Sequence, residues 1–281
     1  MTVTEVLRLA TQRLANAGVA EPVLDAELLL RHVMEWDRAA LLARGAALLS
    51  SDQAKRFLAL VGEREARRPL QHLTGTQAFW GRDFLVTPDV LIPRPETETL
   101  VETALGLLSG LGSPVVVDVG TGSGCIALTI AAERPDAAVH GVDISHAALE
   151  VARINARRLG LESRVLLFQG DLLSPVSHLA GSVHLVVSNP PYVPPDQFPS
   201  LMPEVRDHDP RLALVPTPDA SDVYRRLAAG ARGLLRSGGA LAVEIGLDMA
   251  DEVRAITERE GFRVEQAVLD LQGIPRVLVA R

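Results

Sequence analysis

The sequence predicts an α/β protein in which helices cover both faces of a mostly parallel sheet. A helical bundle precedes this part along the chain. From Val115 onward, short β-branched runs alternate with helical segments. Such alternation is typical of parallel strands joined by crossover helices. The residues before Pro69 show only helical periodicity. We therefore expect a helical domain over residues 1–72, a β-hairpin linker over 73–92 and the α/β domain over 93–281.

Local signals predict where the first helices begin and end. The segments Thr2–Glu5 and Ser50–Gln53 fit the capping box, in which two side chains satisfy free N–H groups of the first helical turn. Pro22 suits the first turn of another helix, and Gly18 suits the end of the one before it. No cluster of reactive residue types occurs in this part, so we expect the bundle to position a partner.

The chain beyond Pro69 carries the signals of a hairpin followed by seven strands. Glycines and aromatic residues over 71–92 predict the hairpin. The proline-rich segment Ile92–Glu98 then leads rigidly into a helix that runs to about Leu108. The last two strands have no helix between them, so they could pair antiparallel at one sheet edge. Strands are expected at 115–119, 139–143, 164–169, 183–188, 240–245, 263–269 and 275–280, and helices at 124–133, 145–159, 222–235 and 248–260.

Composition excludes several classes of protein. The 281 residues are 47% hydrophobic and 22% charged, which is typical of a globular protein. No apolar run has the length of a membrane helix and the first residues lack a signal-peptide pattern, so we expect a cytoplasmic protein without a membrane partner. Cys125 is the only cysteine, so neither an intramolecular disulfide nor a multi-cysteine metal site can form. The histidines lack metal-ligand spacing, and we predict no metal.

Charge is distributed unevenly along the chain. The formal net charge is −7, yet residues 1–90 hold 11 basic and 11 acidic residues. The remaining 17 basic and 24 acidic residues lie further on, so the acidic excess belongs to the α/β part. This argues against a broad phosphate-binding surface there, although a local basic patch is still compatible with it.

A glycine-rich loop follows the strand expected at 115–119. Residues 118–124 read D-V-G-T-G-S-G and open a helix, and Asp143 ends the next strand, where a carboxylate can accept hydrogen bonds from ribose hydroxyls. The dinucleotide pattern would require glycine or alanine at the position of Cys125. A Walker loop would require Gly-Lys-Ser/Thr, which this sequence does not contain. The pattern is similar to that of methyltransferases that bind S-adenosylmethionine. A dinucleotide site and a merely structural turn are the less favoured alternatives.

The sequence Asn189-Pro190-Pro191-Tyr192 directly follows the apolar run at 183–188. Two prolines cannot continue a strand, so a stiff loop begins at its carboxyl end, the edge where open α/β sheets bind ligands. The Asn189 side chain and the Pro190 carbonyl offer two acceptors that match the two N–H bonds of a planar NH₂ group. Such a group would be aimed at a methyl donor, and Tyr192 could pack against it.

At this point the whole chain resembles the protein-(glutamine-N5) methyltransferases of the HemK/PrmC type, which modify peptide chain release factors. The resemblance includes residues 69–75 (P-L-Q-H-L-T-G), 79–84 (F-W-G-R-D-F) and above all 90–98 (V-L-I-P-R-P-E-T-E). It continues through the glycine loop, Gly170-Asp171, residues 189–192, residues 243–246 (V-E-I-G) and residues 273–276 (G-I-P-R). The proline-rich segment distinguishes this family from other methyltransferases that share the Asn-Pro-Pro-Tyr loop.

The resemblance implies a Rossmann-like, seven-stranded S-adenosylmethionine-dependent catalytic domain that methylates the glutamine of the Gly-Gly-Gln motif in class I release factors. One departure is Asp209 before Pro210, where the family often has glutamate. The implied catalytic residues are Asn189, Pro190 and Tyr192, and Pro191 and Arg94 join them in holding the substrate. The implied cofactor-binding residues are Gly120, Thr121, Gly122, Ser123, Gly124, Asp143, Asp171, Leu172 and Asn189.

Two other functions remain as alternatives. An adenine-N6 nucleic-acid methyltransferase can use the same loop on a flipped base, but it would normally need a basic surface. A binding module would have kept the fold without catalysis. Among single residues, Cys125 is expected to be structural, and Glu244 either supports the site or belongs to a buried network. Arg94 contacts cofactor or acceptor, or it pairs with Glu96 or Glu98.

Overall fold

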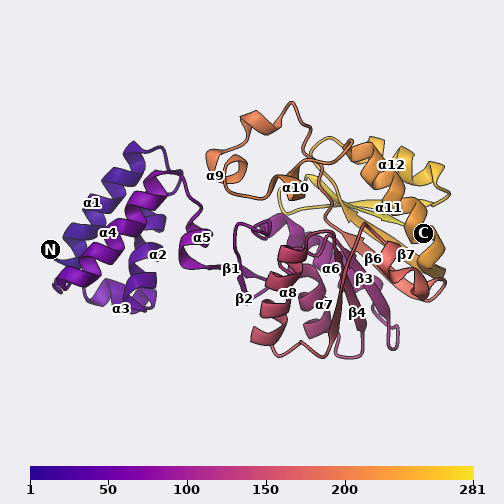
Figure 1. Ribbon diagram of the computed structural model, residues 1–281, viewed down its shortest axis with the longest axis horizontal. Helices are drawn as coiled ribbons and strands as arrows, with labels where there is room; N and C mark the ends of the chain where they lie inside the picture. Colours follow the sequence, from indigo (N-terminus) through magenta and orange to yellow (C-terminus); the bar gives the residue numbers. More distant parts are fainter. The chain divides into compact units, whose positions relative to one another are not determined.

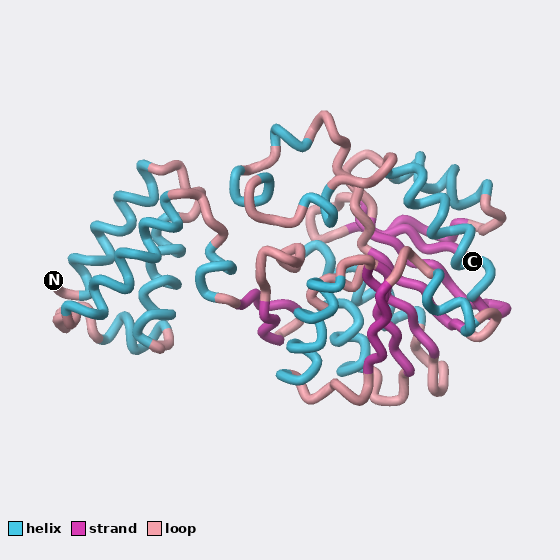
Figure 2. Tube along the Cα trace, viewed as in Figure 1, coloured by secondary structure: helices cyan, strands magenta, loops and turns pink.

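The computed structural model describes residues 1–281 and divides them into two compact units. The first comprises Met1–Thr76 together with Met202–His208, and the second comprises Gln77–Leu201 together with Asp209–Arg281. Figures 1 and 2 show the helices of the first unit and the sheet of the second. The boundaries expected at 72/73 and 92/93 stay a prediction. No local pattern in the sequence distinguishes residues 202–208 from their neighbours.

The first unit is built from short amphipathic helices. Its core contains Leu14, Leu29, Leu30 and Phe57, all fully buried. Both predicted capping boxes are present, since the hydroxyls of Thr2 and Ser50 accept hydrogen bonds from backbone N–H groups three residues on. The helices are α1 (Val3–Asn16), α2 (Pro22–Met34), α3 (Arg38–Ala43), α4 (Ser51–Glu65), α5 (Leu70–Thr74) and, from the later segment, α9 (Pro203–Arg206).

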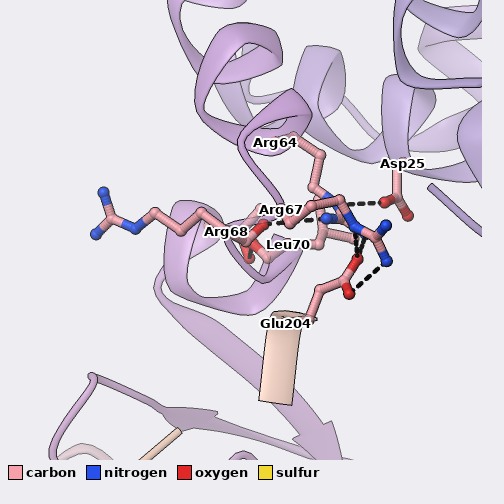
Figure 3. A network of polar contacts seen from close by, with 7 residues as sticks. Asp25, Arg64, Arg67, Arg68, Leu70 and Glu204 are labelled. Atoms are coloured by element: carbon pink, nitrogen blue, oxygen red, sulfur yellow. Dashed lines mark hydrogen bonds and ion pairs between the residues drawn. The ribbon is translucent and has the colours of Figure 1, made fainter. Parts of the chain in front are cut away.

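A buried ionic cluster ties α9 to the rest of the first unit, as Figure 3 shows. Arg64 bonds Asp25 at 2.7 Å and Glu204 at 2.8 Å. Arg67 donates to both oxygens of the same Glu204 carboxylate, from Nε to Oε1 at 2.7 Å and from Nη2 to Oε2 at 2.6 Å. Burial alone would raise the pKa of Glu204, but the two arginines outweigh it and lower that pKa to about 2. The cluster therefore attaches a segment that lies 140 residues further along the chain.

The predicted hairpin forms from β1 (Thr76–Phe79) and β2 (Arg82–Leu85). Its two-residue turn is Trp80-Gly81, and both residues have positive φ, 50° and 68°. Such a turn matches the twist of the paired strands, and glycine adopts it without strain. Phe79 and Phe84 pack edge to face across the hairpin, with ring centroids 6.0 Å apart.

The second unit contains the predicted seven-stranded sheet, in the order β5-β4-β3-β6-β7-β9-β8. All neighbouring pairs are parallel except those of β9, which is antiparallel to β7 and β8, so the predicted antiparallel pair at one edge is confirmed. The strands are β3 (Val115–Val119), β4 (Ala138–Asp143), β5 (Val165–Gln169), β6 (Val183–Ser188), β7 (Leu235–Glu244), β8 (Val264–Leu269) and β9 (Pro275–Ala280).

One strand begins earlier than predicted. β7 starts at Leu235, although its expected start was residue 240 and residue 235 was assigned to a helix. The early part pairs with β6 through an irregular register between Val183 and Leu185, and Gly238 has a φ of 76°. Exposed residues with two glycines lack the alternation by which a strand is recognised, so the sequence pattern predicts no strand before residue 240.

Helices cover both faces of the sheet. One apolar core lies under α6 (Glu98–Leu107), α7 (Cys125–Glu133) and α8 (His146–Arg158), and the other lies under α11 (Ala220–Leu234) and α12 (Ala250–Arg259), two groups that Figure 1 shows on opposite sides. None of the helices has the length and apolar character needed to cross a membrane. Shorter elements are η1 (Pro95–Thr97), η2 (Ser174–Leu179), η3 (Phe198–Ser200) and α10 (Arg211–Leu214).

The strand order reverses between β3 and β6. From β3 the chain continues outward to β4 and β5, whereas β6 continues to β7 on the other side. The loops after β3 and β6 therefore leave the same sheet edge in opposite directions, which opens a crevice where such folds bind ligands. The glycine-rich loop follows β3 and the Asn-Pro-Pro-Tyr loop follows β6.

Candidate active site

A cavity of about 410 Å³ opens at this reversal point, entirely within the second unit. Its wall contains most of the residues that the sequence indicated for a site. Three of the indicated residues, Gly124, Pro190 and Tyr192, are not part of the wall. Those that line it are Arg94, Gly120, Thr121, Gly122, Ser123, Asp143, Asp171, Leu172, Asn189 and Pro191.

The glycine-rich loop is folded tightly against β4. The backbone N–H groups of Gly120 and Thr121 both donate to the carbonyl of Val142, at 2.8 and 3.0 Å. Gly122 has a φ of 54°, which favours glycine. Gly124 serves packing instead, because a Cβ atom there would come within 2.9 Å of the Leu128 side chain. The loop thus exposes the backbone of residues 120–123 to the cavity, with Gly124 beneath.

Asp118, the first residue of the glycine motif, is fully buried behind the loop. Its Oδ2 atom accepts hydrogen bonds from the Thr121 hydroxyl at 2.6 Å and from the Ala127 N–H at 3.2 Å. Burial raises the pKa of Asp118 to about 7, against the opposing effect of these two bonds. Asp118 therefore joins the loop to the start of α7 and does not line the cavity.

Asp143 presents its carboxylate at the cavity wall in a fixed orientation. Oδ2 accepts a hydrogen bond from the N–H of Gly122 and Oδ1 accepts one from the N–H of Ser145, both at 2.9 Å. Burial raises the pKa of this carboxyl, while the backbone donors act against the shift. Each carboxylate oxygen still has a lone pair for a ligand, because each carries about two acceptor sites.

The side chains of the Asn-Pro-Pro-Tyr loop diverge. Asn189 lies on the cavity wall, and its Nδ2 donates to the Thr97 hydroxyl at 3.2 Å. Tyr192 packs into the core under α11 and α12 instead, where its hydroxyl donates to Glu244 at 3.4 Å. Burial raises the pKa of Tyr192, so the phenol stays protonated at neutral pH. Of the two, only Asn189 faces the ligand space.

Arg94 pairs with a residue far away in the sequence. Its Nη2 atom lies 2.5 Å from Oδ2 of Asp209, so the alternative that it pairs with Glu96 or Glu98 is wrong. Glu98 accepts a hydrogen bond from the Trp80 N–H instead, at 2.7 Å. Burial raises the pKa of Asp209 to about 6, although the Arg94 charge acts in the opposite direction. The pair holds the start of a segment, residues 210–217, whose members also line the cavity.

Several residues of the site are assigned no role by the sequence patterns, although Thr97 lies in the segment 90–98 that carries the family resemblance. Thr97 and Arg226 line the cavity, and Arg226 forms an ion pair with Asp171 from another element. Asp209 was noticed as a departure from a family pattern, but its partner was not foreseen. Contacts of this kind join residues 55 to 115 positions apart, which no local pattern reports.

The lone cysteine, Cys125, also lines the cavity. Cys125 is buried at the start of α7, and burial raises the pKa of its thiol to about 12. The thiol is therefore protonated and unreactive at neutral pH, which agrees with its expected structural role. No group of three potential metal ligands occurs in the structure.

A doubly wound sheet with these two loops at its reversal point defines the class of the protein as a Rossmann-like methyltransferase. Comparison with known families agrees, because the PrmC N-terminal domain matches residues 5–75 and the methyltransferase small domain matches residues 98–201.

Similar proteins give a closer assignment. A release factor glutamine methyltransferase of Moorella thermoacetica is 47% identical over 281 residues, covering 100% of this chain and 98% of its own. One of Cereibacter sphaeroides is 44% identical over 283 residues, covering 100% and 99%. A third, of Geobacter sulfurreducens, is 40% identical and covers 100% and 96%. The chain belongs to the release factor glutamine methyltransferase family.

Proposed function

We propose that this protein transfers a methyl group from S-adenosylmethionine to the side-chain amide nitrogen of the glutamine in the Gly-Gly-Gln motif of class I peptide chain release factors. The observation that carries the proposal is Asn189, whose side-chain amide lies on the cavity wall beside the glycine-rich loop. The names of the relatives support the substrate class.

The cofactor fits the groups that the cavity offers. S-adenosylmethionine supplies an electrophilic methyl group when it is bound. The backbone of Gly120–Ser123 suits its amino-carboxylate end, and the fixed carboxylate of Asp143 suits its ribose hydroxyls. Ile144 and Leu172 line the same cavity with apolar surface, and Ile144 is 53% exposed. An aromatic base resting on these side chains would remove that apolar surface from water.

The acceptor site orients a weak nucleophile. A carboxamide nitrogen has a delocalised lone pair, so its reactivity depends on orientation and on loss of planarity. Asn189 uses Nδ2 to bond Thr97, which leaves Oδ1 free to accept one N–H of the glutamine. We assign the second N–H to the carbonyl of Pro190, which is not itself part of the wall but lies in the chain between the wall residues Asn189 and Pro191. With both hydrogens held, the nitrogen is aimed at the methyl group, and no strong general base is required.

The direct test is methyl transfer with labelled S-adenosylmethionine and a purified class I release factor. We expect the label on the Gly-Gly-Gln glutamine and none on a release factor with that glutamine changed to alanine. Asn189→Ala should lower turnover roughly 10²–10³-fold, as when one preorganised polar contact to the reacting group is lost, with cofactor binding retained. Labelling of adenine in DNA, with none of the release factor, would instead establish the nucleic-acid alternative. Cofactor binding without any transfer would establish a binding module.

A further inference from the structure

A second cavity adjoins the end of the first cavity at which the proposed function places the adenine base. It has a volume of about 420 Å³ and is lined by the segment after β5 and by α11. Asp171, Leu172 and Arg226 line both cavities. A wall that two cavities share decides what can pass from one into the other.

The border between the cavities can be located along two stretches of chain. On α11, Val223 lines only the cofactor cavity and Gly230 lines only the second cavity. Arg226 lies between them and lines both, so it marks the border on the helix. On the segment after β5, the border lies at Asp171 and Leu172.

The segment after β5 is fixed by its backbone. The N–H of Gly170 donates to the carbonyl of Asp143 at 3.0 Å, and the carbonyl of Asp171 accepts from the Ser174 hydroxyl at 2.8 Å. Leu172 has a φ of 48°, which is uncommon for a residue other than glycine. This backbone keeps the Asp171 carboxylate and the Leu172 side chain at the border.

Arg226 closes the border from the side of α11. Its Nη2 atom donates to Oδ2 of Asp171, and the side chains of Arg226 and Asp171 are 38% and 52% exposed. Ion pairs with this exposure contribute little to folding stability. What distinguishes this pair is its place, because it joins the two walls where the cavities meet.

The chemistry of adenine suits this border. A base that rests on Leu172 lies beside Asp171, the residue before it in the chain. Arg226 occupies Oδ2 of Asp171, so Oδ1 can accept one N–H of the exocyclic amine. A group attached to that amine would have to pass between Asp171 and Arg226 to reach the second cavity.

We propose that Arg226 is a specificity-determining residue that closes the base end of the cofactor cavity together with Asp171. The site then accepts an adenine whose exocyclic amine is free and excludes one whose amine carries a bulky group. This inference rests on the proposed function, because it requires the base of the cofactor to lie against Leu172.

The test compares two ligands in calorimetric binding experiments, so the readout does not depend on methyl transfer. One is S-adenosylhomocysteine, which is the cofactor without its methyl group, and the other is the same compound with a benzyl group on the exocyclic amine. We expect the wild type to bind the benzyl compound roughly 10- to 100-fold more weakly, the effect of forcing a bulky group against a packed wall.

Arg226→Ala should remove most of this preference. Without the Arg226 side chain the benzyl group can enter the second cavity, so the two compounds should bind almost equally. Arg226→Lys keeps a cation that can pair with Asp171 and should keep most of the wild-type preference. Arg225→Ala is the matched control, because it breaks an ion pair with Asp222 on the same helix and should leave the preference unchanged.

The outcomes separate this inference from the proposed function. Binding of the unsubstituted compound shows that a variant is folded. Equal affinity of the two compounds in the wild type, or the full wild-type preference in Arg226→Ala, would overturn the inference and leave the proposed function intact. A wild type that binds neither compound contradicts the proposed function, and this inference with it.

Discussion

At the scale of single residues, Asp143, which we propose binds the ribose of the cofactor, shows how the structure can orient a carboxylate in advance. Two backbone N–H groups hold its oxygens at 2.9 Å, one from the glycine loop and one from the start of α8. A ligand that uses this carboxylate therefore does not have to order it. Preorganisation of this kind improves affinity by lowering the entropic cost of binding.

Replacement of Asp143 should weaken cofactor binding selectively. Two charge-assisted hydrogen bonds to ribose would be lost in Asp143→Ala, so we expect the dissociation constant of S-adenosylmethionine to rise roughly 10- to 100-fold, measured by calorimetry. Asp143→Asn keeps the shape of the side chain and one acceptor oxygen. Its dissociation constant for S-adenosylmethionine should therefore lie between those of the wild type and Asp143→Ala. Asp136→Ala, on an exposed carboxylate outside the cavity, serves as the control. Equal affinity in Asp143→Ala and the wild type would exclude Asp143 from the cofactor site.

At the scale of elements, the capping boxes give a local account of where helices begin. In α4 the Ser50 hydroxyl accepts from the N–H of Gln53 at 3.2 Å, and the Gln53 side chain accepts from the N–H of Ser50 at 2.9 Å. Two N–H groups that a helix otherwise leaves free are satisfied in this way.

Loss of this cap should lower the stability of the first unit. We expect Ser50→Ala to reduce the free energy of unfolding by about 1 kcal/mol, while Ser51→Ala, one residue into the helix, should change little. Denaturant unfolding can be followed by Trp36 fluorescence in a Trp80→Phe background, because these are the two tryptophans of the chain. Equal losses in both serine variants would show that the hydroxyl of Ser50 does not stabilise the helix.

Elements with strong local signals could be predicted from the sequence. The β-branched runs of β3 and β6 and the proline that begins α2 determine structure within a few residues. Contacts between distant segments could not be predicted in this way. Neither the pairing of Arg94 with Asp209 nor the orientation of Tyr192 away from the cavity has a local cause, because both depend on which loops the fold brings together.

At the scale of the whole molecule, the ionic cluster around Glu204 should make the first unit sensitive to acid. The folded-state pKa of Glu204 is about 2, below its ordinary value of 4.5. A carboxyl whose pKa is lowered by folding contributes stability above its unfolded pKa, and this stability is lost as pH falls from 4.5 towards 2.

Replacement of Glu204 should therefore lower the free energy of unfolding more at neutral pH than in acid. Glu204→Ala leaves the half-buried guanidinium of Arg67 without its partner and the buried Arg64 with Asp25 alone. The loss of stability should therefore stay below the roughly 3–5 kcal/mol that removing one partner of a fully buried ion pair costs. In the Trp36 unfolding assay, the difference in the free energy of unfolding between Glu204→Ala and the wild type should become smaller as the pH falls below the ordinary pKa of glutamate. Asp207→Asn, in an exposed pair with Arg206, should cost less than about 1 kcal/mol. A gap that stays constant with pH would contradict the lowered pKa of Glu204.

The return of residues 202–208 to the first unit has a consequence for dissecting this protein. A fragment ending at Thr76 would keep Arg64 and Arg67 but lose the Glu204 carboxylate that pairs with both, leaving only Asp25 beside Arg64. The complementary fragment would carry Glu204 without Arg64 and Arg67, its two ion-pair partners. The first unit is therefore compact in space but not continuous in sequence. Neither a single cut in the chain nor an exchange of residues 1–76 between relatives should give a first unit with all of its residues. A helical bundle transplanted from a relative would also need that relative's residues corresponding to 202–208, placed between the loop that begins at Asn189 and the segment that begins at Asp209.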